Sequence, residues 1–573
     1  MTANSVTRLR LLFAGVLLVA LVLWAKLFFV QLIKGDFYAA RADRQYQRPS
    51  GLPPERGTIY FSAADGQLVS AAAMQNGFLL ALNPQLLERP AEVYEKLNAI
   101  LPLNRDEFEK KAGKTSDPYE ELLSRVPADL AAKIEALELS GVMLLKTRWR
   151  VYPGRTLAAH AIGFLGYDGD ELTGRYGLER FYNDLLIRPE DENFISFIAR
   201  AFSEIGAGVR ERPAANGGAR TAADLILTIE PTVQQTLEKT LAEVGERYLA
   251  EQVGGVIMDP ISGELVALGA WPTFDPGGKV ESVAVLQNPL VENVYEMGSI
   301  IKPLTLASAL DAGVIVPATT YHDAGFLILN GERVANFDGR GRGTVSMQEV
   351  LNQSLNTGAV FASQKLGSER FRQYFLNFGL GEPTGIDLPN EASGLLKNLS
   401  SRQEVDVATA AFGQGIALTP LATVRALSAL AVGRLPAPRL VKRFDYVDTR
   451  LSAEAPPAAA PRQVLKPETA KTITGMLVRT VDEALLNGAV KMEHYQIAAK
   501  TGTAQMPTPG GGYDPNRFLH SFFGYFPASQ PRFIVFLYLV NPRGVRYASE
   551  TLTQPFMELT RFLLNYYHLP PDR

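Results

Sequence analysis

The sequence predicts an α+β protein of several domains, preceded by a single N-terminal transmembrane helix. Three observations lead to this expectation. The chain has 573 residues, whereas one domain commonly holds roughly 100–200 residues. An uncharged apolar stretch begins at Leu11. Beyond it, strand-like alternation and amphipathic helical patterns are interleaved along the chain.

The N-terminal segment predicts a membrane anchor at residues 11–33. Leu11–Ala25 carries no charge, and the apolar character resumes after Lys26. Roughly 23 helical residues reach about 34 Å, which spans a bilayer core of about 30 Å, and Lys26 lies off-centre, where it can extend towards the headgroups. We expect an uncleaved anchor behind a tail at residues 1–10, with a cleaved signal peptide as the alternative. Basic residues on both sides leave the orientation open.

The composition narrows the possible chemistry. The chain contains no cysteine and five histidines, with no H-E-x-x-H motif. A thiol nucleophile, disulfides, iron–sulfur clusters and Cys-ligated zinc are thereby excluded, and a metal site built from histidines is poorly supported. The net charge of −3 does not indicate nucleic acid as a partner. Any nucleophile must therefore come from Ser, Thr, Lys, Tyr or a carboxylate.

The rest of the chain divides into two predicted regions. Residues 34–223 mix short strands and helices without a catalytic motif. The stretch Gly208–Asp224 is rich in Gly, Ala and Arg, as in a surface linker, so the second region is placed at 224–573. In this second region we expect a strand at Asp224–Ile229, a helix at Pro231–Glu251, a hairpin within Gly254–Trp271 and two strands within Ser521–Val540.

One serine stands out as a candidate nucleophile. Ser299 is the only serine in the chain with a lysine three residues later, Lys302. On a helix, residues i and i+3 share one face, so the lysine can reach the serine hydroxyl. Gly298 and Ser299 are expected to cap this helix, whose free N–H groups would favour an oxyanion. By itself the short S-x-x-K pattern is more often an ordinary helix start with a solvated lysine.

Two further motifs follow in the chain. Ser354-Leu355-Asn356 forms a polar turn in an apolar context. Lys500-Thr501-Gly502-Thr503 follows an apolar run and reads as a strand whose glycine lets another backbone come close. Each is weak alone, since turn formers and edge-strand glycines are common.

Together, S-x-x-K, S-x-N and K-T-G in this order are typical of penicillin-binding proteins and serine β-lactamases. The chain resembles the class B penicillin-binding proteins, membrane-anchored D,D-transpeptidases of peptidoglycan synthesis, over nearly its whole length. Other segments similar to that family are Glu55–Tyr60, Arg150–Arg155, Gly174–Leu186, Leu227–Gln235, Phe378–Glu391 and Phe412–Pro420.

The resemblance implies an α+β pedestal at 34–223, of the dimerisation type, and a transpeptidase domain at 224–573. In the latter, helices cover both faces of a mostly antiparallel, β-lactamase-like sheet. It also implies a cytoplasmic N-terminus, a single-pass anchor in the cytoplasmic membrane and a body outside the cytoplasm. The implied partners are peptidoglycan stem peptides on lipid-linked or nascent glycan strands, β-lactams, a polytopic membrane glycan polymerase and proteins of the division complex. No cofactor or metal is implied.

The resemblance also implies a role for each motif residue. Ser299 attacks the penultimate D-Ala, Lys302 is the base, Ser354 relays a proton, and Asn356 orients Lys302 and the substrate amide. The charge of Lys500 and the hydroxyls of Thr501 and Thr503 hold the substrate carboxylate, beside Gly502 in the same strand. The backbone N–H groups of Ser299 and Thr503 form the oxyanion hole.

This chain departs from the family pattern at several positions, and other functions remain open. Leu355 stands where the family commonly has serine, and the residues after Tyr60 lack the acidic and basic ends of its R-G-x-I-x-D-R pattern. Met297 and Ile300 stand where the family usually has proline and a small polar residue, which should change the shape of the pocket rather than the reaction. A septal role is favoured over an elongation role, with a β-lactam sensor, a β-lactamase and a catalytically silent scaffold as further alternatives. The Glu190–Phe194 segment resembles a glycosyltransferase motif but comes too late in the chain for that domain.

Overall fold

The computed structural model describes residues 53–169, 171–188, 222–279, 282–446, 452–455, 459–508 and 510–573, together with Phe13 and Lys26. The rest of the predicted anchor, most of the predicted linker and the Glu190–Phe194 segment lie outside these residues. Among the described residues, no helix is long and apolar enough to cross a membrane.

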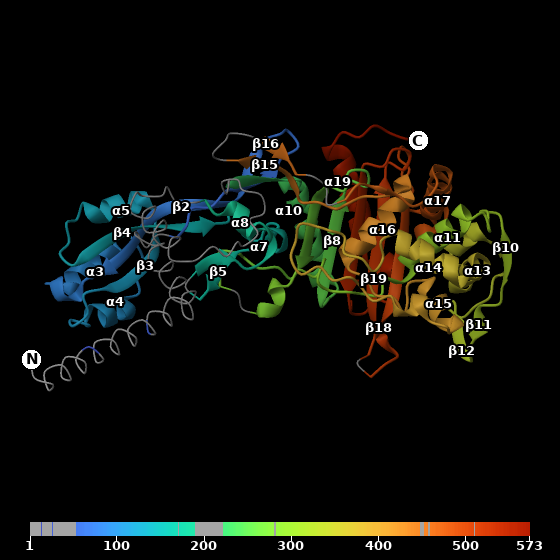
Figure 1. Ribbon diagram of the computed structural model, residues 1–573, viewed down its shortest axis with the longest axis horizontal. Coiled ribbons are helices and arrows are strands. Elements are labelled where there is room, and N and C mark those ends of the chain that lie inside the picture. The colour runs from blue at the N-terminus through green and yellow to red at the C-terminus, as the bar shows by residue number, and fades with distance from the viewer. Residues whose placement is uncertain are drawn as a thin grey trace, which may run out of the picture. The chain divides into compact units, whose positions relative to one another are not determined.

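The secondary structure mixes strands and helices throughout (Figure 1). The strands are β1 (Ile59–Ser62), β2 (Leu68–Leu82), β3 (Glu120–Val126), β4 (Val142–Val151), β5 (Leu165–Asp168), β6 (Glu171–Gly174), β7 (Ala223–Leu227), β8 (Gln252–Met258), β9 (Leu265–Trp271), β10 (Thr320–Asp323), β11 (Phe326–Leu329), β12 (Glu332–Ala335), β13 (Gly343–Ser346), β14 (Arg434–Leu435), β15 (Val441–Tyr446), β16 (Ser452–Glu454), β17 (Arg462–Gln463), β18 (Ala498–Pro507), β19 (Tyr513–Phe526) and β20 (Phe533–Val540). The α-helices are α3 (Pro90–Asn98), α4 (Arg105–Ala112), α5 (Ala128–Glu135), α6 (Ala159–Ile162), α7 (Gly177–Phe181), α8 (Asn183–Leu186), α10 (Pro231–Arg247), α11 (Lys302–Asp311), α12 (Met347–Asn352), α13 (Asn356–Leu366), α14 (Ser368–Asn377), α15 (Glu404–Ala410), α16 (Pro420–Val432), α17 (Pro467–Arg479), α18 (Ala548–Thr551) and α19 (Thr553–Tyr566).

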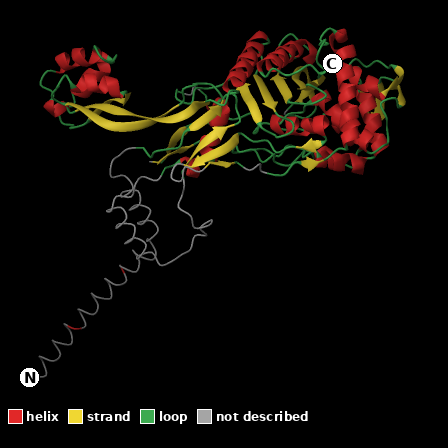
Figure 2. Ribbon diagram, turned by 90° about the horizontal axis from the view of Figure 1, so that it is seen from above, coloured by secondary structure: helices red, strands yellow, loops and turns green. Residues whose placement is uncertain are grey.

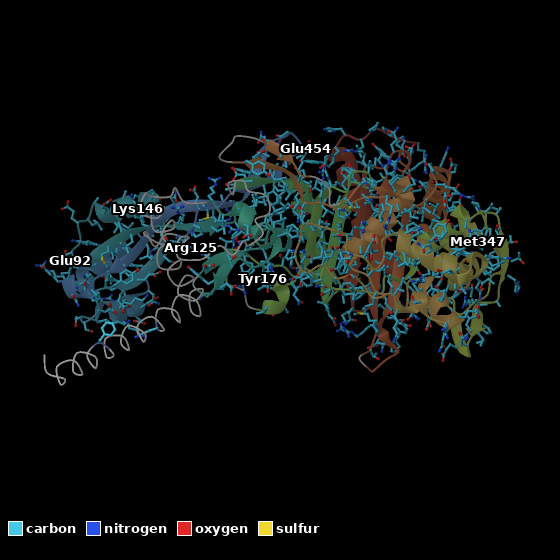
Figure 3. All side chains as sticks on the ribbon, in the orientation of Figure 1. Glu92, Arg125, Lys146, Tyr176, Met347 and Glu454 are labelled. Atoms are coloured by element: carbon cyan, nitrogen blue, oxygen red, sulfur yellow. The ribbon has the colours of Figure 1, made fainter. Side chains whose placement is uncertain are left out.

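The chain forms two compact units. In the smaller one, the second half of β2 pairs with β3 and β4, and α3, α4 and α5 cover the strands. Its core is apolar and consists of Leu80, Leu82, Val93, Leu97, Phe108, Val126, Ala131 and Ile134, with neighbouring side chains packed around it. Glu92 of α3 and Lys146 of β4, on the surface of this unit, are labelled in Figure 3.

The larger unit is built on a five-stranded antiparallel sheet with the order β18-β19-β20-β8-β9. Every residue of β20 is buried, since this strand lies in the middle of the sheet. Side chains of successive strand residues point to opposite faces. Val535 and Leu537 accordingly join one apolar cluster, whereas Ile534 and Phe536 join another. One strand therefore contributes to two separate cores.

Helices cover both faces of this sheet. The cluster of Val535 and Leu537 includes side chains of α10 and α19. The cluster on the other face is larger and takes in α11, α13, α16 and α17. Figure 2 shows helices beside these strands. Met347, at the start of α12, is labelled in Figure 3. The predicted sandwich of helices around an antiparallel sheet is confirmed, as are the strand β7, the helix α10, the hairpin of β8 and β9, and the strands β19 and β20.

Segments from before residue 187 also belong to the larger unit. Strand β1 runs parallel to β7, which pairs in turn with β15. Arg150, at the end of β4, donates from Nε to Oε1 of Glu179 at 2.6 Å and from Nη1 to the Gly57 carbonyl at 2.8 Å. The side chains of Arg150 and Glu179 are only 3% and 0% exposed. Three of the family-like segments therefore meet at one buried ion pair.

Replacing Arg150 by methionine tests this ion pair. Arg150→Met removes the guanidinium from a buried carboxylate, which typically costs about 3–5 kcal/mol. We expect a correspondingly lower melting temperature for the larger unit in calorimetry. Arg150→Met combined with Glu179→Leu should recover part of the loss, because no buried charge remains there. A cost below about 1 kcal/mol for the single variant would show that the pair is not structurally important.

Candidate active site

The candidate nucleophile lies in a tight turn at the start of a helix. Gly298–Ile301 is a 3₁₀ turn, and α11 follows directly from Lys302. In a 3₁₀ turn residues i and i+3 lie directly above one another, so Ser299 and Lys302 share one face. The prediction that Gly298 and Ser299 cap the helix is wrong. The position before α11 is Ile301, no side chain caps the helix, and the 3₁₀ turn occupies the place of the cap.

A glycine is required at the entrance to this turn. Gly298 has a φ of +65°, and a Cβ there would come within 2.7 Å of the Thr503 carbonyl oxygen. Its N–H donates to the Gly413 carbonyl at 3.1 Å. Gly413 has a φ of +82°, and a Cβ on it would meet the Gly298 oxygen at 2.2 Å. The family-like segment Phe412–Pro420 therefore packs directly against the 3₁₀ turn that carries Ser299, which we call the nucleophile turn.

Lys302 is buried completely, with 0% of its surface exposed. Its Nζ donates to the carbonyl oxygen of Ser354 at 2.5 Å and to Ser354 Oγ at 3.1 Å. Burial holds the Lys302 pKa well below its usual value, and the nearby charge of Lys500 lowers this pKa further. Since burial disfavours the ammonium form, Lys302 is suited to accept a proton.

Ser354 joins the three motifs. It lies between α12 and α13 with a φ of +54°, a conformation that non-glycine residues rarely adopt. Lys500 Nζ donates to Ser354 Oγ at 3.1 Å and to the Thr501 carbonyl at 3.0 Å. Lys302 and Lys500 thus both contact one hydroxyl. In the described part of the chain, the Ser299 hydroxyl makes no hydrogen bond to another side chain.

In the described residues, the Asn356 side chain forms a hydrogen bond with neither Lys302 nor Lys500. Its Nδ2 donates to the carbonyl oxygen of Ala335 at 2.8 Å. The side chain is half-buried at the first turn of α13. In the described part of the chain, Asn356 is therefore attached to the last residue of β12 rather than to Lys302.

The K-T-G motif lies on β18, which is an edge strand of the sheet. A Cβ on Gly502 would meet Ser521 Oγ at 2.4 Å and the Met297 oxygen at 2.8 Å. Ser521 Oγ itself donates to the Met297 oxygen at 2.9 Å. The glycine thus lets the nucleophile turn pack directly on the strand, as its position in the motif indicated. Ser521 was not foreseen, because a lone serine in an apolar strand carries no signal in the sequence.

Thr503 and Lys500 are both held on this strand. The Thr503 hydroxyl accepts a hydrogen bond from the Ala548 N–H at 3.1 Å, which leaves its own proton available for a ligand. Lys500 is 4% exposed, and burial lowers its pKa to about 8. Thr501 is half-buried. The strand therefore presents a cation, hydroxyl groups and edge backbone groups beside Ser299.

Two of the departures from the family pattern, Met297 and Ile300, are buried. Met297 is 1% and Ile300 0% exposed, and both belong to the large apolar cluster. Their side chains therefore pack in the apolar core next to the nucleophile turn. In the described residues, no group of three or more His, Asp or Glu side chains is placed to hold a metal ion.

This arrangement supports nucleophilic catalysis by serine. A hydroxyl, a buried amine one turn away, a second hydroxyl within reach of that amine and a cation at a strand edge are the components of acyl transfer through a covalent intermediate. The family model of the penicillin-binding protein transpeptidase domain matches residues 253–559, more than half of the chain. The family model of the penicillin-binding protein dimerisation domain matches residues 51–193.

The chain is a class B penicillin-binding protein. Named relatives span nearly all of it. Stage V sporulation protein D of Bacillus subtilis is 30% identical over 97% of this chain and 85% of its own length. The probable peptidoglycan D,D-transpeptidase PenA of Neisseria gonorrhoeae is 26% identical over 100% of this chain and 94% of its own. The peptidoglycan D,D-transpeptidase MrdA of Acinetobacter baumannii is 26% identical over 94% and 86%.

Solved penicillin-binding proteins share the fold. Penicillin-binding protein 3 of Mycobacterium tuberculosis, in its complex with aztreonam, has a TM-score of 0.68 and 22% identity, and covers 91% of this chain and 98% of its own. A peptidoglycan synthetase from Bifidobacterium adolescentis has a TM-score of 0.67 at 22% identity, with 91% and 97% covered. The class B architecture expected from the motifs is confirmed.

The rate at which a penicillin acylates this penicillin-binding protein should depend on pH in a bell shape. It rises as Lys302 loses its proton and becomes a base. It falls as pH increases through about 8, where Lys500 loses the charge that holds the ligand carboxylate. Lys500→Arg keeps a positive charge at all these pH values, so its falling limb should move to higher pH.

The pH profile is obtained from acylation rates measured between pH 5.5 and 10 by stopped flow or on gels. Lys471→Arg, on the exposed side of α17, is the matched control. The control should keep the wild-type profile. A wild-type rate that does not decline between pH 7.5 and 9.5 would be incompatible with the role given to Lys500.

Proposed function

We propose that this chain crosslinks peptidoglycan stem peptides as a serine D,D-transpeptidase, releasing D-Ala. The proposal rests on the hydrogen bonds that the amines of Lys302 and Lys500 both donate to the Ser354 hydroxyl. Lys302 lies one helical turn after Ser299. This geometry provides a proton acceptor for Ser299 and a route along which that proton reaches a leaving amine. Relatives named peptidoglycan D,D-transpeptidase support the same chemistry.

Acylation follows from these contacts. Ser299 Oγ bonds to the carbonyl carbon of the penultimate D-Ala, and its proton passes to the neutral amine of Lys302. The C–N bond to the terminal D-Ala then breaks, and Ser354 passes a proton from Lys302 to the leaving amine across the 3.1 Å contact. The N–H groups of Ser299 and Thr503 stabilise the oxyanion, where one donor is typically worth about 3 kcal/mol.

Substrate binding uses the exposed edge of β18. An extended stem peptide adds to this edge through backbone hydrogen bonds. Lys500, Thr501 and Thr503 hold its terminal carboxylate, with the free proton of Thr503 as one donor. An amine from a neighbouring stem peptide then attacks the acyl-enzyme and forms the crosslink. Water in its place gives carboxypeptidase activity.

A β-lactam acylates the same serine in this proposal, because its strained amide takes the place of the D-Ala-D-Ala bond. Solved relatives of the same fold are described as complexes with aztreonam and ampicillin. A fluorescent penicillin should label the full-length protein, and Ser299→Ala should abolish labelling. Ser368→Ala, at an exposed position at the start of α14, is the control that should label normally.

Labelling that persists in Ser299→Ala would refute the assignment of the nucleophile. Absence of labelling in a wild-type protein with a cooperative melting transition would favour the silent-scaffold alternative. Rapid turnover of the bound penicillin would favour the β-lactamase alternative.

We also propose a septal role and a single-pass location, with residues 1–10 in the cytoplasm, the anchor at 11–33 in the cytoplasmic membrane and the body outside the cytoplasm. The proposal also includes a pedestal at residues 34–223 and a transpeptidase domain at residues 224–573. The apolar run at Leu11–Ala25 supports the anchor. In this proposal the pedestal and the anchor contact a polytopic glycan polymerase within the division complex.

Depletion of the protein in its host tests the role and the location together. Filamentous cells are expected, because septal crosslinking fails while elongation continues, and rounded cells would indicate lateral-wall synthesis instead. Full-length protein should restore division and fractionate with membranes, whereas a chain lacking residues 1–33 should do neither. A mature protein that begins after residue 33 would establish a cleaved signal peptide.

A further inference from the structure

The segment between β10 and β13, residues 323–343, borders the S-x-N motif. Arg342 Nε donates to Oε1 of Gln353, the residue before Ser354, at 3.1 Å. The Ala335 carbonyl accepts from Asn356, as described above. Asn336 Oδ1 accepts from the N–H of Thr357, the residue after Asn356, at 3.2 Å. Residues on both sides of Ser354 are therefore attached to this one segment.

Asp323 organises the segment from its centre. It is the last residue of β10 and is 1% exposed. Its Oδ1 accepts from the Gly325 N–H at 2.9 Å, and its Oδ2 accepts from the Arg342 N–H at 3.0 Å. Asn336 Nδ2 lies 3.0 Å from both carboxylate oxygens. One buried carboxylate thus holds the beginning, middle and end of the segment.

Asp323 also contacts the motif helix directly. The Thr357 hydroxyl donates to Asp323 Oδ1 at 2.8 Å and lies 3.0 Å from the Tyr321 hydroxyl. Thr357 is 2% exposed, so water does not compete freely for this hydrogen bond. The carboxylate therefore fixes the first turn of α13, which directly follows Ser354 and Leu355.

The conformation of Ser354 requires such support. A non-glycine residue at a φ of +54° is strained, and this conformation persists only where the surroundings hold it. The Ser354 hydroxyl must also remain 3.1 Å from two separate lysines. A shift of about 1 Å in a catalytic group can cost about 100-fold in rate.

We propose that Asp323 is a positioning residue for the reaction, one that holds Ser354 and Asn356 in their working positions through Thr357, Asn336 and Arg342. This inference rests on the proposed function and goes beyond the three motifs, since Asp323 lies outside all of them. Asp323 touches no reacting group itself.

Asp323→Asn is the first test. The amide of asparagine has nearly the same shape as the carboxylate. Its NH₂ group, however, would face N–H and O–H groups that donate to the carboxylate in the wild type, so some of these hydrogen bonds would be lost. We expect the rate constant of acylation by a fluorescent penicillin to fall about 10- to 100-fold, while the final labelled fraction stays near one per molecule. A merely structural role would lower the labelled fraction and leave the rate constant of the folded molecules unchanged.

Asp387→Asn is the matched control. Asp387 is 8% exposed and accepts from the N–H groups of Leu440 and Val441 at 2.8 and 2.9 Å. Its replacement removes a comparable hydrogen-bonded carboxylate away from the motifs, and the acylation rate constant should not change. An equal loss of rate in Asp387→Asn would overturn the proposal, because a general loosening of the domain would then explain both results.

Thr357 provides a second test that does not depend on the folding of Asp323→Asn. Thr357→Val removes the hydroxyl at constant shape and should slow acylation, whereas Thr357→Ser retains the hydroxyl and should restore a rate near that of wild type. Equal rates for the two variants would overturn the positioning role. The wild type is measured in parallel. If the wild type is not acylated, the proposed function and the inference are both overturned. If the wild type is acylated normally and the variants react at the same rate, only the inference is overturned.

Discussion

The burial of Lys302 beside Lys500 is the constraint on which the site depends. Two amines share one hydroxyl, that of Ser354, in a region from which water is excluded. Burial lowers the pKa of both amines, and the charge of Lys500 lowers the pKa of Lys302 further. Lys302 is therefore suited to accept a proton, whereas Lys500 remains cationic up to a pH of about 8.

The architecture of the larger unit supplies this environment. Helices on both faces bury the central strand β20 completely, so the sheet is a rigid platform. Only at its edge does a strand keep free backbone groups, and β18 with the K-T-G motif occupies that edge. The nucleophile turn packs against β18 through the glycines at 298 and 502. Rigid packing and an open edge thus coincide at Ser299.

Much of this organisation could be predicted from the amino-acid sequence. The apolar runs on both sides of the proline-containing turn in Ser521–Val540 predicted β19 and β20, and the turn residues around Asp259 predicted the hairpin of β8 and β9. The three motifs named the residues that the structure brings together. The predicted cap at Ser299 was wrong because helix periodicity does not distinguish a 3₁₀ turn from an α-helical first turn. Ser521, Gly413 and Asp323 had no signal, because each acts through partners that are distant in the chain.

The sequence by itself predicted the class of chemistry and the candidate reacting groups, through three motifs and the family that they resemble. With no cysteine, and with one serine that precedes a lysine by three residues, few nucleophiles remained possible. Only the tertiary structure decided which amines are buried, that Ser354 has a left-handed conformation and which carboxylate bonds to the helix that follows it. These properties depend on burial and on contacts between residues far apart in the chain, such as Lys500 with Ser354 and Asp323 with Thr357. Local sequence patterns carry no information about such contacts, because desolvation and long-range hydrogen bonds arise only when the chain is packed.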